Sequence, residues 1–190
     1  MLNRSGWQTN HLVSLVRNGG VIAYPTEGVW GLGCLPESLP AVTRILRLKN
    51  RSWEQGLILV GASIEQFHPY LTGLSQDALD ELYRVWPGPV TYLLPDNGYC
   101  PLWIKGKHTT VALRVSDHPI VQDLCDLLAS PLVSTSANPA GRIPARNSLQ
   151  VRKYFPTGID FIVQGKVGES GGASEVRNLI TGSIVRAGTS

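Results

Sequence analysis

A run of four consecutive aliphatic residues, 57–60, constrains the fold of this chain most strongly. Such a run cannot alternate between a core and solvent, so a strand with this pattern is expected to be covered on both faces. Short apolar runs also begin at residues 21, 90, 110 and 132, and segments of helical period separate several of them. This order predicts an α/β fold with a twisted mixed parallel and antiparallel sheet flanked by helices.

Hydrophobic periodicity and turn residues set the expected boundaries of these elements. Helices are expected at residues 7–18, 38–48, 75–86 and 147–154, and another follows 117–119, where Asp117 is expected to cap the free amides. Strands are expected at residues 21–24, 57–60, 90–94, 110–115, 132–134 and 160–163, with a hairpin around Thr181 and Gly182 closing the chain. Residues 25–33 and 95–109 are expected to form glycine-containing loops.

Length and composition limit the class of protein. The 190 residues, 43% hydrophobic and 16% charged, predict one globular domain over residues 1–190. No apolar run approaches the roughly 18 to 20 residues of a membrane helix, and the N-terminus lacks the apolar core of a signal peptide, so a cytoplasmic location without membrane contact is expected.

The scattered cysteines and histidines lack metal-ligand spacing, so no metal site is predicted from them. The net charge of +3 suits anionic substrates or weak RNA contact, but it equally fits ordinary surface charge and is not typical of a dedicated nucleic-acid binder.

Two predicted strands end in dense clusters of hydrogen-bonding or flexible residues. The apolar run at 131–133 is followed by Ser134, Thr135, Ser136 and Asn138, and the strand at 21–24 is followed by the glycine-rich segment 25–33. Ligands of open α/β sheets bind just beyond the carboxyl ends of strands. The two strand ends therefore predict one small-molecule site with two walls, although either segment can also be a structural turn.

The hydroxyl cluster invites a comparison with serine hydrolases. Covalent catalysis would need a histidine base and an acid in the right geometry, and no G-x-S-x-G elbow is present. Ser134 and Ser136 are therefore predicted to donate hydrogen bonds rather than to act as nucleophiles. Glu27 and Glu175 are the acids within the ligand-like segments, and a general acid/base pair between them has little support from the sequence.

Three cations stand at positions that allow two interpretations each. Lys49 and Arg51 end a predicted helix, where cations complement the helix dipole but can also clamp a phosphate group. Arg114 lies within an apolar strand, where a charge must be paired, as with Asp117, or must face an anion. Neither a G-x-G-x-x-G nor a G-x-x-x-x-G-K-[ST] sequence is present.

Taken together and in this order, these segments resemble the YrdC/TsaC family, the L-threonylcarbamoyladenylate synthases, in its single-domain form. The resemblance spans nearly the whole chain, and eight modest motifs in sequence order make it specific. The matching segments are residues 25–33, 48–51, 56–59, 86–91, 111–115, 117–119, 133–138 and 174–175 with 185–188.

The resemblance implies a YrdC-like (RibB-like) fold around a deep basic cavity. It also implies a nucleotidyltransferase that forms threonylcarbamoyl-AMP and pyrophosphate from L-threonine, bicarbonate and ATP, with Mg²⁺ accompanying the nucleotide. A separate complex would then transfer the threonylcarbamoyl group to the tRNA adenosine next to the anticodon.

The resemblance also assigns site residues, which would act by positioning and charge stabilisation without a covalent intermediate. Thr26 would hold threonine, Lys49 and Arg51 would bind ATP phosphates, and Arg114 would help to hold the anionic intermediate or phosphate. Ser134, Ser136 and Asn138 would contact the nucleotide and the threonylcarbamoyl group, and the nucleotide side would be closed by Arg146, Ser174 and Arg186. Ser52 and Gly28 depart from common family residues, and greater loop mobility is expected at both positions.

Two other functions fit parts of the sequence. A non-catalytic RNA-binding or ribosome-maturation module would use the same basic cavity to attract a phosphate backbone, with a steep dependence on salt. A carbamoyl-phosphate-linked maturation protein is disfavoured, because the chain carries no acylphosphatase-like or zinc-finger segment.

Overall fold

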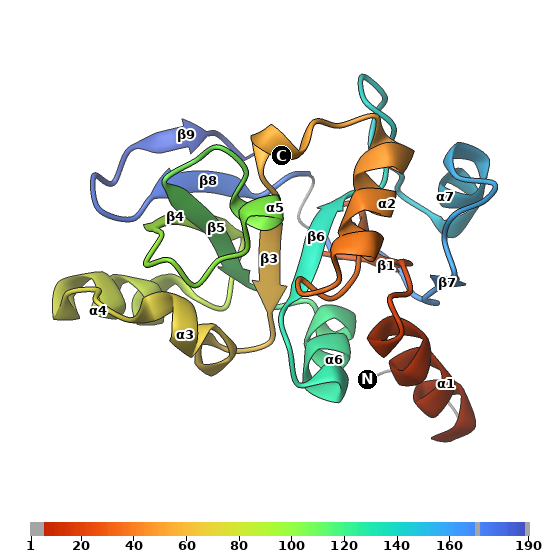
Figure 1. Ribbon diagram of the computed structural model, residues 1–190, viewed down its shortest axis with the longest axis horizontal. Helices are drawn as coiled ribbons and strands as arrows, with labels where there is room; N and C mark the ends of the chain where they lie inside the picture. Colours follow the sequence, from red (N-terminus) through yellow and green to blue (C-terminus); the bar gives the residue numbers. More distant parts are fainter. Residues whose placement is uncertain (1–5, 170–171, 189–190) are drawn as a thin grey trace.

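The computed structural model of the protein describes residues 6–169 and 172–188. Its strands are β1 (Ile22–Pro25), β2 (Trp30–Gly33), β3 (Ile58–Gly61), β4 (Val90–Pro95), β5 (Thr110–Val115), β6 (Leu132–Ser136), β7 (Phe161–Ile162), β8 (Glu175–Asn178) and β9 (Ile184–Arg186). Within the described residues these strands form one sheet in the order β7-β1-β2-β6-β3-β5-β4-β8-β9 (Figure 1). The pairs β1/β7, β3/β5 and β4/β8 are parallel and the other neighbours are antiparallel, so the predicted mixed sheet is confirmed.

The helices lie near their expected positions. They are α1 (Gly6–Arg17), α2 (Leu39–Lys49), α3 (His68–Leu71), α4 (Gln76–Val85), α5 (Leu102–Lys105), α6 (Pro119–Leu128) and α7 (Ser148–Tyr154), with short 3-10 turns η1 (Trp53–Gln55) and η2 (Ile64–Phe67). In the described part of the chain, no helix is both long and apolar enough to cross a lipid bilayer.

Two hydrophobic clusters cover opposite faces of the central sheet. Successive residues of one strand belong to different clusters: Leu59 packs with α2 and α4, whereas Val60 packs with α1 and α6. Val133 and Leu132 of β6 divide in the same way. Figure 1 shows α1 and α6 close to one another, and contacts join them. The aliphatic run at residues 57–60 therefore reflects a strand buried on both faces, as expected.

Several local expectations were wrong. Residues 30–33 form β2, which pairs antiparallel with β1, although its two glycines disfavour a strand by propensity. The predicted loop at 95–109 contains α5. His118 takes the N-cap position of α6 without a side-chain cap bond, so Asp117 does not cap this helix. The closing hairpin is present, but its first strand, β8, lies earlier in the chain than expected.

Gly33 marks a close approach between β1, β2 and β6. A Cβ atom at this position would lie 2.5 Å from the Val133 carbonyl oxygen and 2.7 Å from Tyr24 Cε1. At Gly31, two residues earlier, the nearest atom to an added Cβ would be Thr26 Cγ2 at 3.4 Å, an ordinary contact. Gly33 therefore lets the backbone of β6 pass where a side chain would stand, whereas Gly31 does not have this constraint.

We predict that Gly33→Ala lowers the free energy of unfolding by about 1–3 kcal/mol, because the new methyl group must displace backbone and a buried ring. Gly31→Ala is the matched control on the same strand, and it should leave stability unchanged or slightly raised, since alanine restricts the unfolded chain. Denaturant titration of both variants tests this. Equal stability of the two variants would contradict the close approach.

Candidate functional site

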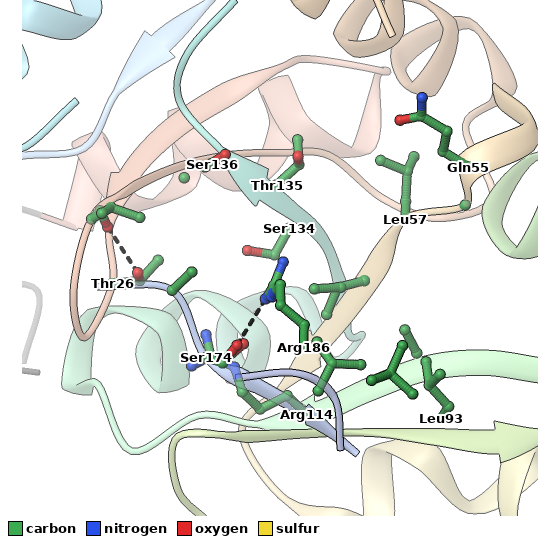
Figure 2. A pocket seen from close by; sticks show the side chains of 18 of the residues that line it. Thr26, Gln55, Leu57, Leu93, Arg114, Ser134, Thr135, Ser136, Ser174 and Arg186 are labelled. Atoms are coloured by element: carbon green, nitrogen blue, oxygen red, sulfur yellow. Dashed lines mark hydrogen bonds between the residues drawn. The ribbon is translucent and has the colours of Figure 1, made fainter. Parts of the chain in front are cut away.

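A cavity of about 400 Å³ lies at the carboxyl end of β6. Its walls come from the β1–β2 turn, the end of β6, the segment before β3, strand β5 and the β8–β9 hairpin. Figure 2 shows Thr26, Ser134, Ser136, Arg114 and Arg186 around this space. The two strand ends that the sequence singled out are thus brought together as facing walls.

Seven of the ten predicted site residues line the cavity, and three do not. Those that line it are Thr26, Arg51, Arg114, Ser134, Ser136, Ser174 and Arg186. Lys49 and Asn138 lie behind the β6 end and contact each other there. Arg146 is exposed before α7, and its backbone amide donates to the side chain of Gln150 at 2.6 Å.

Thr26 is fixed by its own turn. Its backbone amide and its Oγ1 hydroxyl both donate to the Val29 carbonyl oxygen, at 3.0 and 2.8 Å. Its carbonyl oxygen accepts from the backbone amide of Gly168 at 3.0 Å. The turn between β1 and β2 therefore presents one buried hydroxyl to the cavity in a set orientation.

The hydroxyl cluster at the end of β6 faces the Thr26 turn. Ser134 pairs with Ile58 of β3, whereas Thr135 and Ser136 pair with Leu32 and Gly31 of β2. The Ser136 hydroxyl donates to Asn138 Oδ1 at 2.6 Å. Its partner is an amide oxygen and not a histidine base, which agrees with a hydrogen-bonding role for this cluster.

Lys49 holds the turn that follows β6. Its ammonium group donates to the Ser136 carbonyl oxygen, to the Asn138 carbonyl oxygen at 2.8 Å and to Asn138 Oδ1 at 3.4 Å. The Lys49 carbonyl oxygen accepts from the Ala140 amide at 2.9 Å. Burial and the neighbouring Arg51 charge lower the pKa of Lys49 to about 8. Lys49 is therefore attached to the turn after β6 and is not among the residues that line the cavity.

Three guanidinium groups converge on the cavity. Burial, and after it the charge of Arg186, lowers the pKa of Arg51. Burial, and after it the charge of Arg114, lowers the pKa of Arg186. Arg51 also donates to the Gly56 carbonyl oxygen at 2.9 Å, and Arg186 to the Ser174 carbonyl oxygen at 2.8 Å. Like charges that repel one another across a cavity form a site for an anion with several negative oxygens.

Arg114 has a different ion-pair partner from the one the sequence suggested. Its Nη2 atom lies 3.0 Å from Glu27 Oε2, and both side chains are more than nine-tenths buried. Glu27 is in the β1–β2 turn and Arg114 on β5, so this partner lies 87 residues away in the chain and not at Asp117. Burial raises the pKa of Glu27, but attraction to Arg114 and the hydrogen bond from Ser116 outweigh it, so the net pKa is lowered. Glu27 is therefore a carboxylate.

Other lining residues were not singled out as site residues from the sequence. Lys105 of α5 lines the cavity and is paired with Asp96, and His108 stands exposed nearby. Both lie in the segment predicted as a loop, where the cluster of basic residues was the available signal. Leu57 and Ala112 give part of the lining an apolar surface that residue chemistry alone could not assign to a site.

The sequence and the fold match known proteins over nearly the whole chain. A family model described as "Telomere recombination", named for Sua5, YciO and YrdC, matches residues 14–188. The threonylcarbamoyl-AMP synthase of Cellvibrio japonicus is 48% identical over 179 residues, which are 94% of this chain and 95% of the relative. The protein of that name from Stutzerimonas stutzeri is 50% identical over 180 residues, 95% of this chain and 97% of the relative.

A solved structure agrees with these matches. P. abyssi Sua5, crystallised in complex with L-threonine, aligns with a TM-score of 0.88 and 32% identity over 97% of this chain. This chain spans 55% of that longer protein. The resemblance inferred from the motifs is confirmed: the chain belongs to the Sua5/YciO/YrdC family.

Proposed function

We propose that this chain is a threonylcarbamoyl-AMP synthase, a nucleotidyltransferase that joins L-threonine, bicarbonate and ATP into threonylcarbamoyl-AMP and releases pyrophosphate. The observation that carries the proposal is the cavity in which hydroxyls from β6 and Thr26 face three guanidinium groups. Relatives of that name, about half identical to the chain, support it further. The product is an activated acyl group that a second enzyme complex would transfer to tRNA.

The reaction needs a donor-rich, positively charged cavity and no nucleophile from the protein. The threonine nitrogen first reacts with bicarbonate to form a carbamate, with water as the leaving group, and a carbamate oxygen then attacks the α-phosphorus of ATP. The P–O bond to pyrophosphate breaks, and its electrons leave with pyrophosphate. Binding the carbamate beside the phosphate replaces an encounter in water by a positioned attack, and fixed guanidinium groups stabilise charge on the phosphate oxygens.

In this proposal, different walls of the cavity bind different substrates. Thr26 binds threonine, and the β6 hydroxyls contact the threonylcarbamoyl group and the nucleotide, which are the roles that the sequence resemblance assigned. The phosphate chain is bound by Arg51, Arg114 and Arg186. The carbonyl oxygen of Ser174 accepts a hydrogen bond from Arg186, which places Ser174 beside this group. Arg146 keeps its assignment on the nucleotide side as a prediction of the resemblance.

Lys49 has a different role in this proposal from the phosphate clamp that the sequence suggested. Its three oxygen acceptors belong to Ser136 and Asn138, so its contribution is to hold the turn that carries the Ser136 side chain. Arg51, which shares the predicted K-x-R motif, supplies the charge to the cavity. Asn138 then acts through Ser136, because its Oδ1 atom accepts the hydrogen bond from the Ser136 hydroxyl.

The described residues do not build a magnesium site of their own. Among them, no group of three or more acidic, histidine or cysteine side chains is arranged to hold a metal ion, and Glu27, the carboxylate of the cavity lining, is paired with Arg114. Mg²⁺ commonly binds through substrate phosphates and water rather than through a protein cage. A magnesium ion that accompanies ATP would therefore be held by the nucleotide phosphates and water.

The wider setting follows from the same proposal. The product would serve the threonylcarbamoyl modification of tRNA in the cytoplasm, with the transfer carried out by another complex. The single-domain organisation over residues 1–190 is part of the proposal and is supported by a sheet that runs from β7 to β9 without a break. Weak RNA binding stays a prediction, and a non-catalytic RNA-binding module is the alternative that the next experiment separates.

We predict that the purified protein releases pyrophosphate from ATP and magnesium only when threonine and bicarbonate are both present, with threonylcarbamoyl-AMP identified by mass spectrometry. Arg51→Ala should lower kcat/KM for ATP by roughly 10²-fold, because it removes a fixed donor to the charged phosphate oxygens. Arg47→Ala removes an exposed cation from the same helix end and is the control. RNA binding without any product would favour the RNA-binding module instead.

A second prediction concerns the pH dependence of stability. Between about pH 8 and the ordinary lysine pKa near 10.4, the unfolded chain holds a proton on Lys49 that the folded chain has lost. Unfolding then takes up a proton, so wild-type stability should rise with pH in this window relative to Lys49→Met. Denaturant titrations at pH 7.5, 8.5 and 9.5 measure this difference, and Lys107→Met controls for loss of an exposed lysine. If the difference in free energy of unfolding between wild type and Lys49→Met stays constant over this pH range, the lowered pKa of Lys49 is wrong.

A further inference from the structure

The ion pair between Glu27 and Arg114 joins two walls of the cavity that the sheet does not pair. Glu27 lies in the turn between β1 and β2, and Arg114 lies on β5. Strands β2, β6 and β3 separate β1 from β5 in the sheet order. The contact of 3.0 Å between Arg114 Nη2 and Glu27 Oε2 therefore crosses the cavity without a backbone ladder beside it.

The carboxylate is itself held from behind. The Ser116 hydroxyl donates to Glu27 Oε1, and the backbone amide of His118 donates to that hydroxyl oxygen at 3.2 Å. The Ser116 backbone is tied to the sheet end, because its amide donates to the Gly61 carbonyl oxygen at 3.0 Å. Ser116 is fully buried. Glu27 therefore occupies a fixed position from which it can orient the guanidinium group.

The pair is poorly explained as a contribution to stability alone. Arg114 Nε is buried without a hydrogen-bond partner in the described structure, and Glu27 Oε2 has the ion-pair contact with Arg114 Nη2 but no regular hydrogen bond. Buried ion pairs with unsatisfied atoms contribute little net stability, because the loss of hydration offsets their attraction. Both side chains line the cavity. The position of this ion pair in the cavity wall is therefore better explained by a role in binding a ligand than by a role in stability.

The surrounding charges explain why Arg114 needs a partner. Arg114 and Arg186 repel each other, since the charge of Arg114 contributes to the lowered pKa of Arg186. Among the residues that line the cavity, Glu27 is the carboxylate that opposes this repulsion at Arg114; Asp117, which also interacts with the charge of Arg114, is not among the lining residues. Glu27 offsets it and fixes the direction of the guanidinium fork, whose planar geometry must match the phosphate or carbamate oxygens.

We propose that Glu27 is a positioning residue of the nucleotide site, which holds the Arg114 guanidinium in the orientation that binds the anionic substrate. This inference rests on the proposed function for the identity of that substrate. Glu27 does not take up the reacting proton: its carboxylate is already engaged by Ser116 and Arg114. It acts through Arg114, and Ser116 supports it in turn.

The sign of the effect on binding separates this role from simple charge compensation. If Glu27 only offsets charge, Glu27→Gln raises the positive potential and tightens ATP binding. If Glu27 positions Arg114, Glu27→Gln releases the guanidinium and weakens binding, and kcat falls because the reacting groups are misaligned. Arg114→Lys keeps the charge without the fork, so positioning predicts that it resembles Glu27→Gln.

The experiment measures ATP–magnesium affinity by calorimetry and kcat by product formation, in the full-length protein. We expect Glu27→Gln to weaken ATP binding and to lower kcat by about 10–100-fold, Ser116→Ala to have a smaller effect in the same direction, and Glu27→Asp to lie between wild type and Glu27→Gln. In a double-mutant cycle, Glu27→Gln should have little further effect once Arg114 is Ala. Unchanged or tighter ATP binding by Glu27→Gln would overturn the proposal, as would an undiminished effect in the Arg114→Ala background.

Two controls keep the result interpretable. Glu81→Gln removes a carboxylate of α4 that binds Arg84 and Tyr92, none of which lines the cavity, and should leave ATP affinity and kcat unchanged. Thermal unfolding of each variant identifies loss of fold, and Glu27→Asp provides a second variant if Glu27→Gln is unstable. If the wild type forms no threonylcarbamoyl-AMP, the proposed function fails; if it does and Glu27→Gln behaves like wild type, the positioning role alone fails.

Discussion

The antiparallel pairing of β6 with two different strands is the constraint on which the rest of the site depends. Residues 132–134 of β6 pair with β3, whereas Thr135 and Ser136 pair with β2. One short strand therefore joins the two parts of the sheet, and its pairing with β3 ends at Ser134, the first of its hydroxyl residues. Because β3 begins opposite Ser134, Thr135 and Ser136 have β2 as a partner on one side and the cavity, instead of β3, on the other.

Much of the fold could be predicted from the sequence, because its strongest signals are local. The run at residues 57–60 and the helical periods give β3, α2 and α4 near their true bounds. Strand β2 could not be predicted in this way, since Gly31 and Gly33 disfavour extended structure by themselves. The presence of Gly33 is explained by its neighbours on adjacent strands: a Cβ at this position would meet the Val133 carbonyl oxygen and Tyr24, whereas Gly31 has no such close contact. Close packing between strands selects glycine there, and no local pattern reports it.

The candidate site was predictable in residue type and less so in geometry. Hydroxyls at a strand end and cations in apolar surroundings are unusual enough to be noticed one at a time. Which partner each finds depends on the tertiary fold: Arg114 finds Glu27 rather than Asp117, and Lys49 finds the carbonyl oxygens of Ser136 and Asn138. A lysine two residues from an arginine suggests a joint clamp, but the two side chains leave the end of α2 in different directions.

The arginines of the cavity lower the stability of the fold and at the same time raise its affinity for an anion. The lowered pKa values of Arg51 and Arg186 mean that their charges are less favourable in the folded protein than in water. Burial is the larger cause and repulsion between neighbouring guanidinium groups adds to it, so a polyanion that binds in the cavity would offset both unfavourable contributions. A carboxylate beside every arginine would remove the repulsion and the attraction for the ligand together. Glu27 opposes Arg114 directly, and the positive potential around Arg51 and Arg186 remains available to the substrate.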